Sequence, residues 1–495
     1  MSVSEQPPQN LYAAREPIFP KRVSGNFRNL KWAIMVVTLG IYYITPWIRW
    51  DRGPELPNQA VLVDLAGRRF FFFWIELWPH EFYFVAGLLI MAGLGLFLFT
   101  SALGRVWCGY TCPQTVWTDL FILVERWVEG DRNARIRLLR QKWDARKARL
   151  RLTKWTIWVL IAVATGGAWV FYFADAPTLL HDLVTFQAPA AAYMTVGILT
   201  ATTFVFGGFM REQVCTYMCP WPRIQAAMMD EDTITIAYRE WRGEPRGKHR
   251  KSHERVAAET WTATAKGQAT APEGAHLGDC IDCNACVNVC PMGIDIRDGQ
   301  QLECITCGLC IDACNEIMDK IGKPRNLIGY MALTDEQRER AGEPPIPVWK
   351  HIIRVRTLMY TVLWAGIGIG LVVALFLRPD LSISVAPVRN PLYVMMSDGT
   401  IRNTYDVRIR NKHGEDRDFA ISLTSDAPLR LSVEGSANAT VDVPANSTKL
   451  ARVYVMADPQ SQAAHRAVTP GWIWVEDTVS HERAGEKTVF NGKAQ

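Results

Sequence analysis

The residues with the clearest capacity for chemistry are the cysteines. The chain has twelve of them, and every one belongs to a short spaced motif. Eight form two consecutive C-x2-C-x2-C-x3-C runs, which are Cys280, Cys283, Cys286 and Cys290, then Cys304, Cys307, Cys310 and Cys314. This spacing is typical of thiolates that bind cubane iron–sulfur clusters, so it indicates one-electron transfer.

The spacing also predicts which cysteines share a cluster. In two-cluster ferredoxins the fourth cysteine of each run binds the other cluster. One 4Fe-4S cluster of this chain would therefore use Cys280, Cys283, Cys286 and Cys314, and the other would use Cys304, Cys307, Cys310 and Cys290. A zinc site is disfavoured, because it would usually take four cysteines in two C-x2-C pairs.

The other four cysteines form two C-x-Y-x-C-P pairs. They are Cys108 and Cys112 before Pro113, and Cys215 and Cys219 before Pro220; we call these four residues the cysteine quartet. If two duplicated halves pack around a pseudo-two-fold axis, the quartet could converge. Thiolates favour Cu(I) or iron–sulfur clusters, which predicts copper or redox chemistry, whereas a redox-active dithiol and purely structural turns are the alternatives.

An arginine precedes each pair of the quartet. Arg105 and Arg211 stand three and four residues before Cys108 and Cys215. A nearby cation lowers the pKa of a thiol. We therefore expect both arginines to activate the pairs.

The elements that position these motifs are apolar segments. Uncharged apolar stretches occupy residues 32–48, 82–103, 155–174, about 189–210 and 357–377. A helix needs roughly 20 apolar residues to cross a hydrocarbon core, so an α-helical bundle of about five spans is predicted, with the short first segment the weakest. Two spans precede each cysteine pair, which indicates a duplicated unit.

Basic residues predict the orientation of these spans. Lys and Arg are concentrated in residues 21–31, 130–154 and 239–251, whereas residues 175–190 have none. The positive-inside rule then places the N-terminus and all twelve cysteines on or near the cytoplasmic side and the C-terminus outside. The net charge of +5 is explained by topology and contact with the lipid bilayer, so no nucleic-acid partner is expected.

The sequence divides into further predicted regions. These are a cytoplasmic tail (1–31), a four-span membrane domain (32–240), a linker (241–276), a ferredoxin-like α+β module (277–330), a connector (331–350), a fifth membrane helix (351–378) and an all-β domain (381–495). In the last region apolar residues alternate with polar ones, as at Tyr405, Val407 and Ile409. Turn residues recur every 8–12 positions, which predicts a β-sandwich of about seven strands.

Three further stretches carry a family resemblance. They are YYITPWIRWDRG at 42–53, WCGYTCPQTVW at 107–117 and RNPLY at 389–393. Together with both ferredoxin runs, they resemble the cytochrome c oxidase maturation proteins of the FixG/RdxA/CcoG type along nearly the whole chain. The resemblance implies a multi-pass protein of the bacterial inner membrane, with the ferredoxin module cytoplasmic and a periplasmic immunoglobulin-like C-terminal domain.

The resemblance also implies a function. The implied protein is an oxidoreductase that reduces Cu(II) to Cu(I) for assembly of cbb(3)-type oxidase, with copper as substrate or transient ligand. Oxidase assembly factors and copper chaperones or transporters are the implied partners, a homodimer is a candidate assembly, and the electron donor stays unknown. Two alternatives remain: a quinol-linked polyferredoxin that passes electrons to a respiratory reductase, and a non-catalytic assembly scaffold.

Overall fold

The computed structural model describes residues 17–52, 56–247, 277–379 and 381–493. Of these, the residues within 1–48 and 59–370 form one compact unit, and those within 49–58 and 371–495 form a second. Most of the predicted linker (248–276) and the first half of the predicted tail (1–16) lie outside the described residues.

The first unit begins with a helix pair. α1 (Asn26–Ile44) and α2 (Tyr83–Leu103) are separated in sequence by a small antiparallel sheet of β1 (Val61–Asp64), β2 (Arg69–Phe72) and β3 (Ile75–Leu77). These three short strands did not emerge from the sequence pattern.

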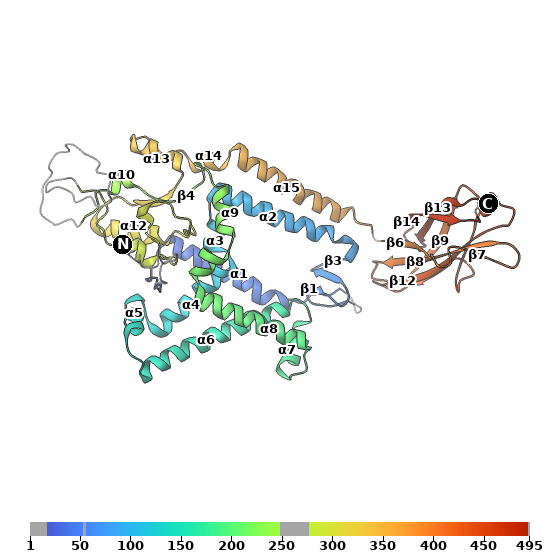
Figure 1. Cartoon of the computed structure of the whole chain (residues 1–495), viewed down its shortest axis with the longest axis horizontal. Helices are drawn as coiled ribbons and strands as arrows, with labels where there is room; N and C mark the ends of the chain where they lie inside the picture. The colour runs from blue at the N-terminus through green and yellow to red at the C-terminus, as the bar shows by residue number, and fades with distance from the viewer. Residues whose placement is uncertain (1–16, 53–55, 248–276, 380, 494–495) are drawn as a thin grey trace, which may run out of the picture. The chain divides into compact units, whose positions relative to one another are not determined.

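The helices around the two cysteine pairs follow in the chain (Figure 1). Its helices are α3 (Val106–Tyr110), α4 (Pro113–Glu129), α5 (Arg132–Arg140), α6 (Ala145–Val170), α7 (Ala176–Val184) and α8 (Ala190–Thr203), then the π-helices η3 (Phe204–Met210) and η4 (Val214–Met218), then α9 (Trp221–Met228). α6 packs against both α4 and α8. Pro113 begins α4, where its missing N–H costs nothing.

Three helices among the described residues are long and apolar enough to cross a membrane. They are α2, the continuous helix Ala190–Met210 and α15 (Val355–Phe376). The other two predicted spans also fold as helices, α1 and α6, but each includes a charged segment in which Lys31 or Lys154 is buried. The number of spans and their orientation therefore stay predictions.

The ferredoxin-like module is built on a two-stranded antiparallel sheet. β4 (Thr235–Tyr238) pairs with β5 (Ile328–Met331), and α11 (Ala285–Val289) packs on α12 (Leu309–Ile321). β4 lies before residue 277, so the sheet also uses a strand from outside the predicted module. The smaller helices are α10 (Glu240–Gly243), η5 (Ile296–Asp298), α13 (Leu333–Arg340) and α14 (Val348–Ile352).

One carboxylate joins α1 to this module. Asp312 on α12 accepts hydrogen bonds from the backbone N–H groups of Phe27 (3.3 Å) and Arg28 (2.8 Å) in the first turn of α1. The first N–H groups of a helix have no partner within it, and Asp312 supplies one. A Cβ on Gly25 would lie 2.3 Å from the Asp312 carboxyl carbon, so this approach requires glycine.

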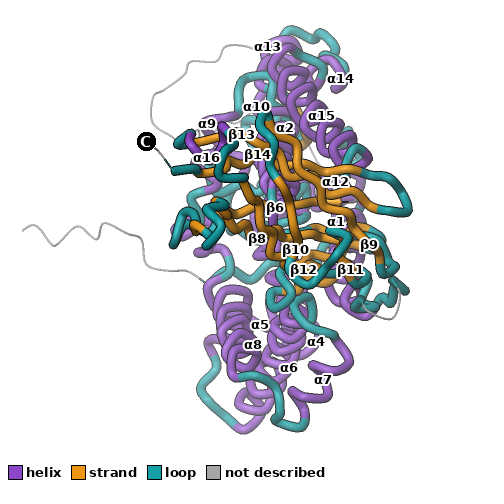
Figure 2. Tube along the Cα trace, turned by 90° about the vertical axis from the view of Figure 1, so that its right-hand side faces the viewer, coloured by secondary structure: helices purple, strands orange, loops and turns teal. Residues whose placement is uncertain are grey.

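The second unit contains a β-sandwich (Figure 2). A five-stranded sheet has the order β10-β12-β8-β6 with β7 paired to β8, and a four-stranded sheet has the order β11-β9-β13-β14. The strands are β6 (Leu381–Pro387), β7 (Val394–Met395), β8 (Ile401–Asn411), β9 (Arg417–Ser425), β10 (Arg430–Val433), β11 (Thr440–Val443), β12 (Thr448–Ala457), β13 (Val468–Asp477) and β14 (Arg483–Asn491).

The alternating pattern of this region is the pattern of its core. Tyr405, Val407 and Ile409 are buried between the sheets, as predicted. The two sheets contain more strands than the predicted seven. The sequence pattern missed some of them because β7 is very short and β14 has few apolar residues.

Candidate functional site

Two cavities in the ferredoxin-like module are lined by cysteines. The first cluster cavity is lined by Cys280, Cys283, Cys286 and Cys314. The second cluster cavity is lined by Cys290, Cys304, Cys307 and Cys310, with Cys286 also reaching it. The structure therefore brings each fourth cysteine to the cavity of the other run.

The composition of both cavities fits iron–sulfur clusters. Soft thiolates are the donors, and the other lining residues are mainly apolar, such as Ile236 and Met292 in the second cavity. Among the described residues, no three His, Cys, Asp or Glu side chains converge as ligands of a single metal ion. Cubane clusters take a separate cysteine at each corner, so their ligands spread around the cavity.

Arg297 stabilises the loop of the first run, and the sequence motifs gave no sign of this role. Its guanidinium donates to the Asp282 carboxylate (2.6 Å) and to the Asn284 side-chain oxygen (2.5 Å). Both residues have positive φ, 50° and 54°. Arg297 therefore fixes the left-handed turns that wrap the loop around the first cluster cavity.

The first cysteine pair of the quartet docks on the loop of the second cluster cavity. Tyr110 donates to the Cys307 carbonyl oxygen (3.0 Å), and the Arg105 guanidinium donates to the Leu302 carbonyl oxygen. Cys108 and Cys307 belong to one buried apolar cluster. The buried end of the quartet thus abuts the second cluster cavity.

Gly109 makes this close approach possible. A Cβ at Gly109 would lie 2.5 Å from the Ile305 carbonyl oxygen and 3.1 Å from the Cys307 Cα. Both are backbone atoms, so the neighbour cannot move aside as a flexible side chain would. Only glycine lets α3 lie against the ligand loop in this way.

We expect Gly109→Ala to weaken the docking of α3. The added methyl group overpacks the interface, at a cost of about 1–3 kcal/mol. The measurement is the midpoint of denaturant unfolding of the whole protein, followed by the loss of cluster absorbance. Gly93→Ala is the matched control, because a Cβ there meets nothing within 4 Å; equal midpoints for the two variants would contradict the prediction.

The quartet runs from a buried to an exposed cysteine. Cys108 is buried, Cys112 and Cys215 are partly buried, and Cys219 is exposed. Cys112, Cys108 and Cys219 each raise the pKa of Cys215, so the four thiols lie near one another. The structure brings the quartet together, although not in the geometry of a closed site for one metal ion.

The expected activation by arginine is wrong in its net effect. Burial raises the pKa of the Cys108 thiol to about 11, and Arg105 only partly opposes this. Burial and the other cysteines raise the pKa of Cys215 to about 12. Arg211 pairs instead with Glu125, and at Cys108 and Cys215 burial outweighs the effect of Arg105 on the pKa.

Gln225 contacts Cys108 from α9, the helix that follows the second cysteine pair. The Cys108 thiol donates to the Gln225 side-chain oxygen (3.1 Å), and the Gln225 amide donates to the Thr100 hydroxyl (3.2 Å). Gln225 is fully buried on α9. It therefore orients the thiol of the first pair, a role that no sequence motif revealed.

The Gln114 side chain on α4 connects this helix to the segment before the second cysteine pair. The Gln114 amide donates to the Phe206 carbonyl oxygen (2.9 Å) and to the Arg211 carbonyl oxygen (3.2 Å). Phe206 lies in η3 and Arg211 directly follows it, and the second cysteine pair lies on and beside η4. The second pair is therefore held by a π-helix, whereas the first pair lies on and beside an α-helix. π-Helices are rare overall, but those that occur are often at functional sites.

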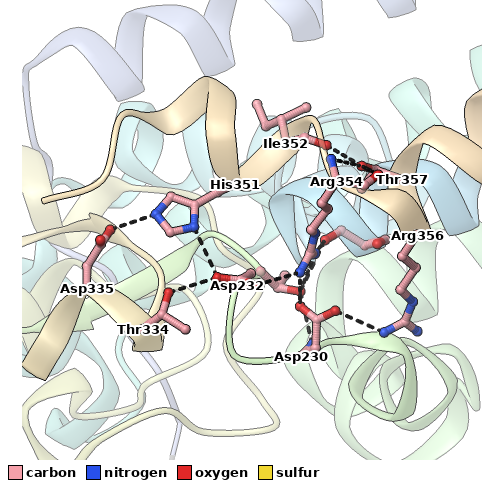
Figure 3. A network of polar contacts seen from close by, with 11 residues as sticks. Asp230, Asp232, Thr334, Asp335, His351, Ile352, Arg354, Arg356 and Thr357 are labelled. Carbon is pink, nitrogen blue, oxygen red and sulfur yellow. Dashed lines mark hydrogen bonds and ion pairs between the residues drawn. The ribbon is translucent and has the colours of Figure 1, made fainter.

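A further network holds the start of α15 (Figure 3). The imidazole of the buried residue His351 lies between Asp232 (3.3 Å) and Asp335 (3.0 Å), and Arg356 donates to Asp230 (3.1 Å). Arg354 also pairs with Asp230. The network joins the start of α15 to the turn that follows α9 and to α13, the helix that follows β5.

Comparisons with known proteins agree with this arrangement. Family models match residues 84–133 as a 4Fe-4S binding domain, residues 210–333 as a 4Fe-4S dicluster domain and residues 371–493 as the IG-like fold at the C-terminal of FixG. The first two matches include both pairs of the quartet.

Three relatives match almost the full chain. Protein RdxB of Cereibacter sphaeroides is 68% identical, covering 98% of each chain. Protein RdxA of the same organism is 61% identical over 97% of this chain and 98% of its own. Nitrogen fixation protein FixG of Rhizobium meliloti is 51% identical over 97% of this chain and 94% of its own.

The fold and the cluster cavities define a membrane iron–sulfur redox protein with an immunoglobulin-like C-terminal domain. The chain belongs to the family of FixG, RdxA and RdxB. The predicted family is thereby confirmed.

Proposed function

We propose that this protein reduces Cu(II) to Cu(I) at the cysteine quartet, for assembly of a cbb(3)-type cytochrome c oxidase. The observation that carries the proposal is the docking of the first cysteine pair on the loop of the second cluster cavity, through Tyr110 and Cys307. Iron–sulfur clusters bound in the two cavities supply one-electron transfer, and Cu(II) needs one electron.

The graded burial of the quartet suits a metal ion that enters and leaves. Cys219 is exposed and offers a first contact from solvent, whereas Cys108 is buried beside the ligand loop. Thiolates are soft ligands that favour Cu(I) over Cu(II), so the same side chains that receive the substrate stabilise the product. Gln225 holds the Cys108 thiol in place at the buried end.

The proposal is tested with the quartet replaced. We expect the variant with Cys108, Cys112, Cys215 and Cys219 all changed to Ser to lose Cu(II) reduction after reduction by dithionite, because it lacks the receiving thiolates. A Cu(I)-specific chelator measures the product. Electron paramagnetic resonance of the two clusters is the control and should be unchanged; an unchanged rate of copper reduction would contradict the assignment.

The proposal extends to location and partners. We place the protein in the bacterial inner membrane as a multi-pass protein, with the ferredoxin-like module in the cytoplasm and the β-sandwich in the periplasm. The basic residues at 130–154 support this orientation through the positive-inside rule. Cu(I) would pass to copper chaperones or transporters, and the sandwich would contact oxidase assembly factors; a homodimer is compatible with these roles.

A further inference from the structure

An apolar groove lies beside the docked α3. Its volume is about 510 Å³, within the range of about 300–1,000 Å³ of small-molecule sites. None of its lining residues is charged; they include Leu30, Phe99, Trp107, Tyr110, Tyr330 and Val348. The groove is therefore suited to an uncharged, lipophilic molecule.

The groove reaches the loop of the second cluster cavity. Tyr110 donates to the carbonyl oxygen of Cys307 (3.0 Å), and Tyr330 donates to that of Thr306 (2.8 Å). Both tyrosines line the groove. Only the side chains of Tyr110 and Tyr330 thus separate a molecule in the groove from the ligand loop, and both side chains hydrogen-bond to that loop.

The mouth of the groove continues into the apolar surface of a membrane span. Phe99 belongs to α2, a candidate span, and is 50% exposed; Leu30 on α1 is 48% exposed. A ligand that partitions into lipid can therefore enter from the bilayer, without crossing water.

The lining selects among lipophilic molecules. Aromatic side chains dominate around the tyrosines, and the Phe27 and Tyr330 rings are 5.3 Å apart. Aromatic walls favour a planar ring through stacked or edge contacts, which an acyl chain does not need. A nicotinamide dinucleotide is disfavoured, because its phosphates require cations or helix N-termini, and the lining has no charged residue.

We propose that this groove binds a quinol, and that quinol is the electron donor of the protein. The inference rests on the proposed function, since it names the source of the electrons for copper. One quinol releases two electrons and two protons and becomes quinone. The two electrons convert two Cu(II) to two Cu(I), and the protons pass to water, so charge and atoms balance. The hydroxyl groups of Tyr110 and Tyr330 can accept hydrogen bonds from the quinol head group.

The test fills the groove in the full-length protein. Leu30→Trp and Val348→Trp add bulk at exposed lining positions, and Val37→Trp and Leu89→Trp are matched controls at exposed apolar positions that do not line it. With decylubiquinol under anaerobic conditions, we expect cluster bleaching to slow at least about tenfold in the filled variants. The control variants should retain the rate of the unmodified protein.

A second readout does not depend on electron transfer. An azido-quinone should photolabel the peptides that contain Leu30 or Phe99 in the unmodified protein and the controls, and label the filled variants weakly. Labelling that is equal in filled and control variants would overturn the proposal, as would unchanged bleaching by decylubiquinol.

The two proposals fail differently. The filled variants, reduced by dithionite, should still convert Cu(II) to Cu(I) at the normal rate if only the groove is impaired. If dithionite-reduced unmodified protein does not reduce copper but decylubiquinol still bleaches its clusters, the copper proposal fails and the quinol site stands.

Discussion

Cys290→Ala is expected to remove the same cluster as Cys304→Ala, although Cys290 belongs to the other sequence run. Cys290 lines the second cluster cavity together with Cys304, Cys307 and Cys310. Loss of one of four thiolate ligands prevents stable binding of a cubane cluster. Each variant should therefore retain about half of the iron, measured by metal analysis and by electron paramagnetic resonance of the dithionite-reduced protein.

Variants of the first cluster cavity provide a reciprocal test. Cys314→Ala should remove the cluster that Cys280→Ala removes, because both residues line the first cluster cavity. The spectra of the four variants then fall into two groups that cross the sequence runs. If Cys290→Ala instead gave the spectrum of Cys280→Ala, the clusters would follow the runs and the assignment would be wrong. Cys290→Ser, a smaller change in size, checks that the result does not come from unfolding.

Local patterns made part of this molecule predictable. Ligand spacing depends on a few adjacent residues, so both ferredoxin runs were evident, and alternation at Tyr405, Val407 and Ile409 reflects the two faces of a strand. These features need no knowledge of distant contacts. The family and its C-terminal fold were also predicted from short stretches, and the comparisons confirm both.

Long-range packing decided what could not be predicted. Tyr110 and Cys307 are 197 positions apart, and no local signal connects them. β4 has only four residues and is recognisable as a strand only through its pairing with β5. The error about thiol pKa has the same origin, because the burial that outweighs Arg105 at Cys108 comes from tertiary packing.

The largest effect on stability is expected at Glu125, which joins α4 to α5, to α6 and to Arg211 before the second cysteine pair. Its carboxylate is buried and pairs with three cations, Arg135, Lys154 and Arg211. Lys154 and Arg151 also pair with Glu129, so the buried carboxylates balance a larger number of cations. Removal of the Glu125 carboxylate takes the ion-pair partner from Arg135 and Arg211 and leaves Lys154 paired with Glu129 alone.

Glu125→Gln should therefore destabilise the protein by roughly 3–5 kcal/mol, the cost of breaking a buried ion pair. The measurement is the free energy of unfolding in denaturant. The matched control is Glu316→Gln, where an exposed pair with Lys320 (side chains 52% and 63% exposed) should contribute less than about 0.5 kcal/mol. A similar small effect at both positions would show that the buried network adds nothing to stability.

The stability of the protein should also depend on pH through Glu125. Burial alone would raise the pKa of Glu125, but Arg211, Arg135 and Lys154 outweigh it and lower the pKa below the usual 4.5. A carboxyl group with a lowered pKa in the folded state stabilises the protein above its unfolded pKa, and this contribution is lost as the pH falls toward the folded value. The unmodified protein should thus lose stability on acidification below about pH 4.5, and the Glu125→Gln variant should lose less.

Because Arg211 lies beside the second cysteine pair, Glu125→Gln should also lower the rate of copper reduction, whereas Glu316→Gln should leave that rate unchanged.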